Sequence, residues 1–294
     1  MRRPARNVAA IVPYPDRSTE RMPVTMDADT VNAPPLLSAR DLSKSFRGLR
    51  ALNRHELTVR QGELVGVIGP NGSGKTTLFN LVCGFTRADA GSVLFDGHEL
   101  TRLRPPTIAR LGVSRTFQGS RVCKSLTVLE NVEAAAQRLH PITLLDAALG
   151  TPRYRRALAA TEEASLELLE LVGLAHLAAA PAGSLPYGDQ RRLEIARALA
   201  SRPRLLLLDE PAAGMDPQET RELMDLIRRI RDGFELAVVV IEHDMDLVMN
   251  LCERIQVLAY GELICEGDPA MVQSDPKVLE AYLGSSRDGS SQHA

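Results

Sequence analysis

The sequence has few cysteines and no long hydrophobic run among its 294 residues. Cys83, Cys123, Cys252 and Cys265 lack the close spacing of a zinc site or a redox pair. We therefore expect reduced thiols, most of them buried, in a cytosolic protein. No apolar run approaches the roughly 20 residues that a membrane-spanning helix needs. If the protein acts at a membrane, we expect another chain to supply the spanning part.

The chain also lacks a strong excess of charge of either sign. Its 35 Lys and Arg residues and 37 Asp and Glu residues give a formal net charge of -2, which gives no support to nucleic-acid binding. The local group of Arg153, Arg155 and Arg156 is more typical of a solvated helix face than of a polyanion site. A content of 44% hydrophobic and 24% charged residues is typical of a folded soluble protein.

The two ends of the chain have little hydrophobic periodicity. Residues 1–35 are interrupted by prolines and lack the continuous apolar segment of a secretory signal, so they predict a disordered extension, with Met22 and Met26 as alternative starts. Residues 285–294 are rich in Ser and Gly and predict a disordered tail. One large domain over residues 36–284 remains.

Within this domain the pattern of apolar and polar residues predicts an α/β fold. Short apolar runs bounded by polar residues fit strands that are buried on both faces of a parallel sheet. A long Ala-, Leu- and Glu-rich stretch predicts helices, with Leu166, Leu169 and Val172 on one core-facing side. We expect strands at residues 57–59, 63–68, 205–208 and 236–241, a helix at 76–83, a hairpin at 93–97 and helices over 128–177.

A complete phosphate-binding motif follows the second of these strands. Residues 69–77 match G-x-x-x-x-G-K-[ST] between an apolar strand and a helix, the context that the motif requires. Its glycines allow backbone N–H groups to surround a phosphate, and the helix directs its positive dipole end at the same anion. We expect the nucleotide to contact Gly69, Pro70, Asn71, Gly72, Ser73, Gly74, Lys75, Thr76 and Thr77. Lys75 would reach the β- and γ-phosphates, and the Thr76 hydroxyl would bind Mg²⁺.

Two acids end another predicted strand. Residues 205–208 are four leucines, and Asp209 and Glu210 follow them. Because ligands bind at the carboxyl edge of a parallel sheet, Asp209 is placed to hold Mg²⁺ through water, and Glu210 to polarise the water that attacks the γ-phosphate.

The phosphate motif alone leaves three classes of enzyme open: GTPase, kinase and ABC ATPase. No N-K-x-D segment that would read guanine occurs, which argues against a GTPase.

A third motif decides the class. Residues 185–193 lead into a predicted helix that runs to about residue 201 and resemble the L-S-G-G-Q signature of ABC ATPases. Residues 213–216 resemble the D-loop of that family. The resemblance extends over about 36–284 and implies a P-loop NTPase (RecA-like) core, an antiparallel β subdomain and an α-helical signature subdomain inserted at about 120–190.

The resemblance also implies roles for single residues. Phe46 resembles the aromatic that stacks on adenine, a contact of ~1–3 kcal/mol by analogy with base stacking. Gln118 resembles the glutamine that contacts Mg²⁺ and takes part in catalysis, and His243 resembles the switch histidine that hydrogen-bonds the γ-phosphate. In the signature, Pro186, Tyr187 and Asp189 depart from the family pattern. The expected phosphate contact there is the Gly188 backbone and the helix end, with Asp189 beside them.

In the family, this signature contacts nucleotide held by another subunit. The resemblance therefore implies a head-to-tail dimer with a second ABC ATPase, identical or different, and ATP and Mg²⁺ between the two chains. It further implies two membrane permease subunits, an external solute-binding protein and a peripheral location on the cytoplasmic face of the inner membrane. Residues 118–132 would receive a short helix of a permease.

Several segments resemble the larger ATPase of high-affinity branched-chain amino acid importers. These segments are residues 112–118, 126–132, 187–194, 241–249 and 280–284, together with the helical stretch 134–173. Related importers carry urea or amides, and no residue in the sequence selects among these solutes.

A soluble ABC ATPase of translation or repair would usually have two cassettes or a long coiled coil. A non-enzymatic regulator would have lost Lys75, Asp209 or Glu210.

Overall fold

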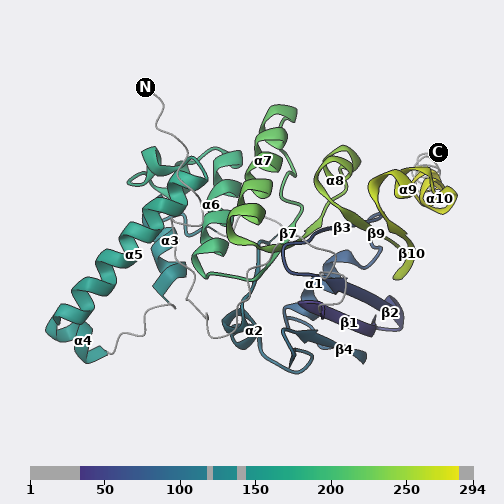
Figure 1. The fold of residues 1–294 in the computed structure, drawn as a ribbon, viewed down its shortest axis with the longest axis horizontal. Helices are drawn as coiled ribbons and strands as arrows, with labels where there is room; N and C mark the ends of the chain where they lie inside the picture. The colour runs from purple at the N-terminus through teal and green to yellow at the C-terminus, as the bar shows by residue number, and fades with distance from the viewer. Residues whose placement is uncertain (1–33, 118–121, 138–143, 285–294) are drawn as a thin grey trace.

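The structure, a computed structural model, describes residues 34–117, 122–137 and 144–284 (Figure 1). The two termini expected to be disordered lie almost entirely outside these ranges, and so does Gln118. None of the helices within the described ranges combines the length and hydropathy that crossing a bilayer requires.

The first sheet is antiparallel and has the strand order β2-β1-β4-β5. Asp96 and Gly97 connect the last two strands with φ angles of 49° and 77°. Two consecutive positive φ values are typical of a tight type I′ hairpin, so the predicted hairpin is confirmed. The strands are β1 (Leu37–Phe46), β2 (Leu49–Val59), β4 (Ala90–Phe95) and β5 (His98–Glu99).

The second sheet has the order β10-β9-β3-β8-β7-β6 and contains the predicted buried strands. Its pairs are parallel except for β9 with β10. Every residue of β3, β7 and β8 is buried, as their apolar runs predict, and the burial extends to Asp209 at the end of β7. The strands are β3 (Leu64–Ile68), β6 (Val113–Arg115), β7 (Leu205–Asp209), β8 (Ala237–Ile241), β9 (Arg254–Ala259) and β10 (Glu262–Gly267).

The helices form two groups around the second sheet. In Figure 1, α3 to α6 lie together on the side away from the antiparallel sheet, whereas α1 lies next to that sheet. The helices are α1 (Lys75–Val82), α2 (Pro105–Leu111), α3 (Val128–Ala136), α4 (Leu144–Leu149), α5 (Pro152–Leu171), α6 (Tyr187–Ala200), α7 (Pro217–Phe234), α8 (Met245–Leu251), α9 (Pro269–Ser274) and α10 (Pro276–Gly284), with 3₁₀ turns η4 (Ala175–Leu177) and η5 (Ala182–Ser184).

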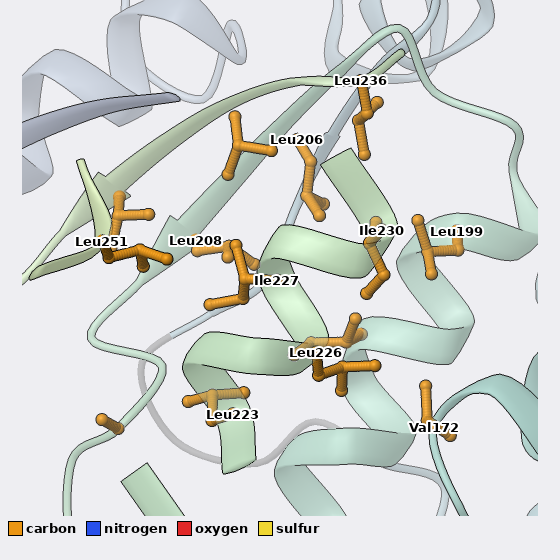
Figure 2. Packing of buried hydrophobic residues seen from close by; sticks show 14 of the residues in the cluster. Val172, Leu199, Leu206, Leu208, Leu223, Leu226, Ile227, Ile230, Leu236 and Leu251 are labelled. Atoms are coloured by element: carbon orange, nitrogen blue, oxygen red, sulfur yellow. The ribbon is translucent and has the colours of Figure 1, made fainter. Parts of the chain in front are cut away.

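Two hydrophobic clusters hold the parallel sheet between them. Successive side chains of a strand point to opposite faces, so β7 contributes Leu206 and Leu208 to one cluster and Leu205 and Leu207 to the other. Figure 2 shows the first cluster, in which residues of α7 such as Ile227 pack beneath the sheet. Each fully buried leucine contributes roughly 1.5–3 kcal/mol, so the strand ends beside these clusters are held firmly.

The prediction of the apolar face of the long helix α5 is wrong at one position. Leu169 and Val172 are buried, but Leu166 is 37% exposed. The buried line of α5 runs through Thr161, Ser165 and Leu168 at helical spacing, and Leu166 lies outside this line. The prediction that most cysteines are buried holds for three of the four, since Cys123 is exposed.

Candidate functional site

The phosphate loop connects β3 to α1 and packs tightly against neighbouring backbone. Gly69 and Gly74 have φ angles of 146° and 109°, a region that side chains disfavour. A Cβ atom on Gly69 would lie 2.0 Å from the carbonyl oxygen of Leu258, and one on Gly74 would lie 2.4 Å from that of Ala51. Both positions therefore require glycine, which explains the spacing of the motif in structural terms.

The lysine of the motif lies inside the curve of the loop. Lys75 is 7% exposed. Its Nζ donates to the carbonyl oxygens of Gly69 and Pro70 at 2.7 and 3.0 Å. Burial lowers the pKa of Lys75, and the charges of Glu210 and Asp209 act in the opposite direction. Lys75 is thus a buried ammonium in the electric field of two carboxylates. Such a group suits a polyanion that arrives with its own bound cation.

Asp209, at the end of β7, forms a buried ion pair. Its Oδ2 lies 2.7 Å from Nη2 of Arg115, and the two side chains are 2% and 5% exposed. Arg115 also donates through Nη1 to Oδ1 of Asn80 at 2.7 Å. The backbone N–H of Asp209 donates to Oγ1 of Thr116 at 3.2 Å. The prediction that Asp209 lies at the strand end is confirmed, and the residues that hold its side chain and its backbone N–H, Arg115 and Thr116, come from the end of β6 and the position directly after it.

Glu210 has an unusual backbone that is anchored to the next strand. Its φ is 47°, in the left-handed region, and its N–H donates to the carbonyl of Ile241 at 2.8 Å. Such a conformation in a non-glycine residue costs of order 1–3 kcal/mol and is found often at functional sites. The backbone of Glu210 is therefore fixed at the end of β7, directly after Asp209.

Glu242 is a residue of this site that the sequence interpretation missed. Its side chain is fully buried. Oε1 accepts from the N–H of Ala212 at 2.9 Å, and Oε2 accepts from the N–H of His243 at 3.1 Å. Burial raises the pKa of Glu242, while these hydrogen bonds and the His243 ring oppose the rise. Glu242 thus joins the segment after Glu210 to the segment that carries His243; an acid at the end of an apolar strand is its only sequence signal.

Two predicted ligand contacts lie at the surface. The side chain of His243 is 61% exposed, and Phe46 is 46% exposed. The Nζ of Lys44 lies 5.4 Å from the centre of the Phe46 ring and also pairs with Asp89 at 2.7 Å. Both side chains are available to a bound molecule, as the expected roles require. The role of Gln118 stays a prediction, because this residue lies outside the described ranges.

The start of α6 packs on the start of α7. Pro186 is its N-cap residue and Asp189 lies in its first turn. A Cβ atom on Gly188 would lie 2.8 Å from Oε1 of Glu219, and one on Gly214 would lie 3.3 Å from the Tyr187 ring. The predicted signature and D-loop are therefore in direct contact, while the phosphate contacts of Gly188 and Asp189 stay predictions.

The C-terminal helix α10 reaches back to the phosphate loop, which sequence reasoning did not foresee. The hydroxyl of Tyr282 lies near the backbone of Gly69; burial raises the pKa of Tyr282, and this neighbour opposes the rise. Since Gly69 opens the loop, the C-terminal segment packs close to the entry of the loop.

The acids near Lys75 fit a metal ion that arrives with a nucleotide. Within the described ranges no three or more His, Cys, Asp or Glu side chains are grouped to hold a metal. Mg²⁺ commonly uses one or two carboxylates together with substrate phosphates and waters. Asp209, Glu210 and the exposed Thr76 beside the loop provide this kind of incomplete donor set.

Comparisons with known proteins agree with the geometry. The ABC transporter family profile matches residues 52–213, and a profile described as branched-chain amino acid ATP-binding cassette transporter matches residues 262–288. The high-affinity branched-chain amino acid transport ATP-binding protein LivG of Escherichia coli K12 is 43% identical over 85% of this chain and 98% of its own length.

Solved structures of cassettes resemble the chain over most of its length. The ADP conformation of an ATP-binding cassette of an ABC transporter has a TM-score of 0.75 at 32% identity, over 86% of this chain and all of the other. A dimeric bacterial ABC transporter cassette has a TM-score of 0.69 at 26% identity, over 79% of this chain and 98% of the other.

Proposed function

Because this chain belongs to the ABC transporter family of ATP-binding cassettes, we propose that it energises the uptake of branched-chain or related amino acids through partner membrane subunits. The chain is an ATPase that binds ATP. The observation that carries the proposed site is the phosphate loop with Lys75 held inside its curve, together with Asp209 at the carboxyl end of β7 in the same sheet and Glu210 directly after it. The amino-acid solute is supported by the relatives named for branched-chain transport and by the C-terminal match.

Within the site, each residue has a separate task. The glycines of residues 69–74 surround the phosphates, and Lys75 exchanges its contacts with loop carbonyls for phosphate oxygens. Phe46 offers its ring to adenine. Glu210 orients and polarises the attacking water, and His243 donates to the γ-phosphate.

Thr76, Asp209 and Gln118 would hold Mg²⁺, which supplies charge neutralisation between the phosphates. The first of these side chains is exposed at the start of α1. Arg115 keeps the carboxylate of Asp209 fixed for this task. All three offer oxygen atoms, the donors that Mg²⁺ prefers.

The full site is proposed to form between two ATPase chains. In Figure 1, α6 belongs to the helical group, and α1 lies near the antiparallel sheet. A second cassette, arranged head to tail, would bring its own Gly188 and the N-terminal end of its α6 to the phosphates held here. The similarity to a cassette solved as a dimer supports this arrangement.

Two permease subunits and an external solute-binding protein complete the proposed importer, with this chain peripheral on the cytoplasmic face of the membrane. A related importer for urea or amides is the alternative, because no residue of the site touches the transported solute. Reconstitution of this chain in liposomes with its permease subunits and solute-binding protein tests both the amino-acid proposal and this alternative. We expect leucine-loaded binding protein to stimulate ATP hydrolysis and uptake of labelled leucine; stimulation by urea or a short amide instead would replace the amino-acid proposal.

A further inference from the structure

Arg191 is a buried cation in α6 with partners in two separate segments. It is 3% exposed. Its Nε and Nη2 donate to the hydroxyl of Tyr187 at 3.1 and 2.7 Å. Its Nη1 donates to the carbonyl oxygen of Phe117 at 3.0 Å and to Oε2 of Glu194 at 2.8 Å. The pair with Glu194 balances the buried charge, and the bonds to Tyr187 and Phe117 satisfy the remaining N–H donors of the guanidinium.

The two further contacts lead to two different parts of the proposed site. Tyr187 is the first residue of α6, and its ring lies against Gly214. Phe117 follows β6, and its ring centre lies 5.1 Å from the guanidinium of Arg115, which pairs with Asp209. One guanidinium therefore connects the start of the signature helix to the segment that holds the carboxylate beside the phosphate loop.

The chemistry of this connection favours a fixed geometry over simple charge balance. The guanidinium is planar, and its donors keep a rigid arrangement, so partners bound to several of its edges are fixed relative to one another. The Phe117 carbonyl belongs to a backbone position 74 residues away in sequence. Hydrogen bonds weaken steeply when the donor angle falls below about 120°, so these contacts resist rotation of α6 against the Phe117 segment.

We propose that Arg191 is a positioning residue that sets the orientation of the start of α6 relative to the Phe117 segment. This proposal rests on the proposed two-chain site, in which the α6 terminus of each chain closes on nucleotide held by the other. Arg191 then governs how productively the site closes. It leaves the affinity of the phosphate loop of its own chain unchanged, because none of its described contacts involves that loop.

The test compares R191Q and Y187F with R228Q in the full-length chain. Arg228 is the control, since it lies outside the signature, on α7, and pairs with Asp225 at 3.0 Å on the exposed side. We expect R191Q to lower kcat for ATP hydrolysis about tenfold or more with KM within about twofold, which corresponds to ~1.4 kcal/mol or more in the transition state alone. Y187F should lower kcat less, and R228Q should match the wild type.

Hydrogen–deuterium exchange supplies the readout that distinguishes positioning from general stability. In R191Q we expect faster exchange in residues 113–117 and 187–193 together, with α7 and α8 unchanged. Faster exchange in α6 alone, or an unchanged kcat, would overturn the proposal. If R191Q does not fold, Y187F carries the test, because it removes only the hydroxyl that accepts from Arg191. A wild-type chain that binds no ATP would instead refute the proposed function itself.

Discussion

Arg115 and Asp209 form an ion pair of 2.7 Å that is almost completely removed from solvent. The arginine ends β6 and the aspartate ends β7, two strands that run parallel and side by side. The guanidinium also lies 5.4 Å from the centre of the Phe79 ring, in the helix that follows the phosphate loop. The metal-binding carboxylate of the proposed site is therefore oriented by the strand that leads to the signature subdomain.

Arg115→Met should destabilise the chain strongly. Removing one partner of a buried pair leaves an uncompensated charge, which typically costs about 3–5 kcal/mol. Urea denaturation followed by circular dichroism measures the loss. Arg54→Met is the matched control, because Arg54 pairs with Asp41 at 3.0 Å but both side chains are more than half exposed; its effect should stay below about 1 kcal/mol. Equal stability of the two variants would contradict the importance of burial here.

Glu210→Gln should retain ATP binding and lose hydrolysis by a factor of roughly 10²–10⁴, because the amide can no longer take up a proton from the attacking water. Phosphate release and equilibrium binding of labelled ATP measure the two effects. Glu235→Gln is a suitable control, since Glu235 also has a positive φ of 49° but lies at the end of α7. Substantial turnover by the Glu210 variant would remove this residue from its assigned role.

Gly74→Ala should abolish ATP binding. The added Cβ would lie 2.4 Å from the carbonyl oxygen of Ala51 at a φ of 109°, so the loop must move away from its phosphate-binding shape. Gly97→Ala is the control. Gly97 also has a positive φ, 77°, so an alanine there strains the backbone as in Gly74→Ala, but no atom lies within 4 Å of the new Cβ. That control should cost only about 1–3 kcal/mol of stability and leave ATP affinity unchanged, as isothermal titration would reveal. Normal affinity in the Gly74 variant would show that the loop tolerates displacement.

The sequence predicted those parts of the site that depend on local pattern. The phosphate loop, Asp209 and Glu210 lie at the ends of apolar strands, and a local motif identifies each of them. Arg115 and Arg191 are different, because one partner of each, Asp209 and Phe117, lies 94 and 74 residues away in sequence. Those contacts depend on the register of β6 against β7 and on the rotation of α6, which no local pattern determines.

Acid should weaken the fold through His55, a buried base on β2. Burial lowers the pKa of His55 to about 4 from an ordinary value of 6.5, and the charge of Glu266 opposes part of this shift. Above pH 6.5 the ring is neutral in both the folded and unfolded chain, so it adds no pH dependence. Between pH 6.5 and 4 only the unfolded chain takes up the proton. The free energy of unfolding therefore falls by about 3 kcal/mol across this window.

His55→Gln isolates this contribution, because glutamine does not titrate. Unfolding by urea at half-unit steps from pH 7 to 4.5 should give a shallower loss of stability for this variant than for the wild type, whatever its stability at pH 7. The exposed His98 on β5 provides the comparison, and His98→Gln should follow the wild-type profile. Parallel profiles for all three proteins would mean that His55 accepts its proton in the folded chain, against the lowered pKa that burial imposes.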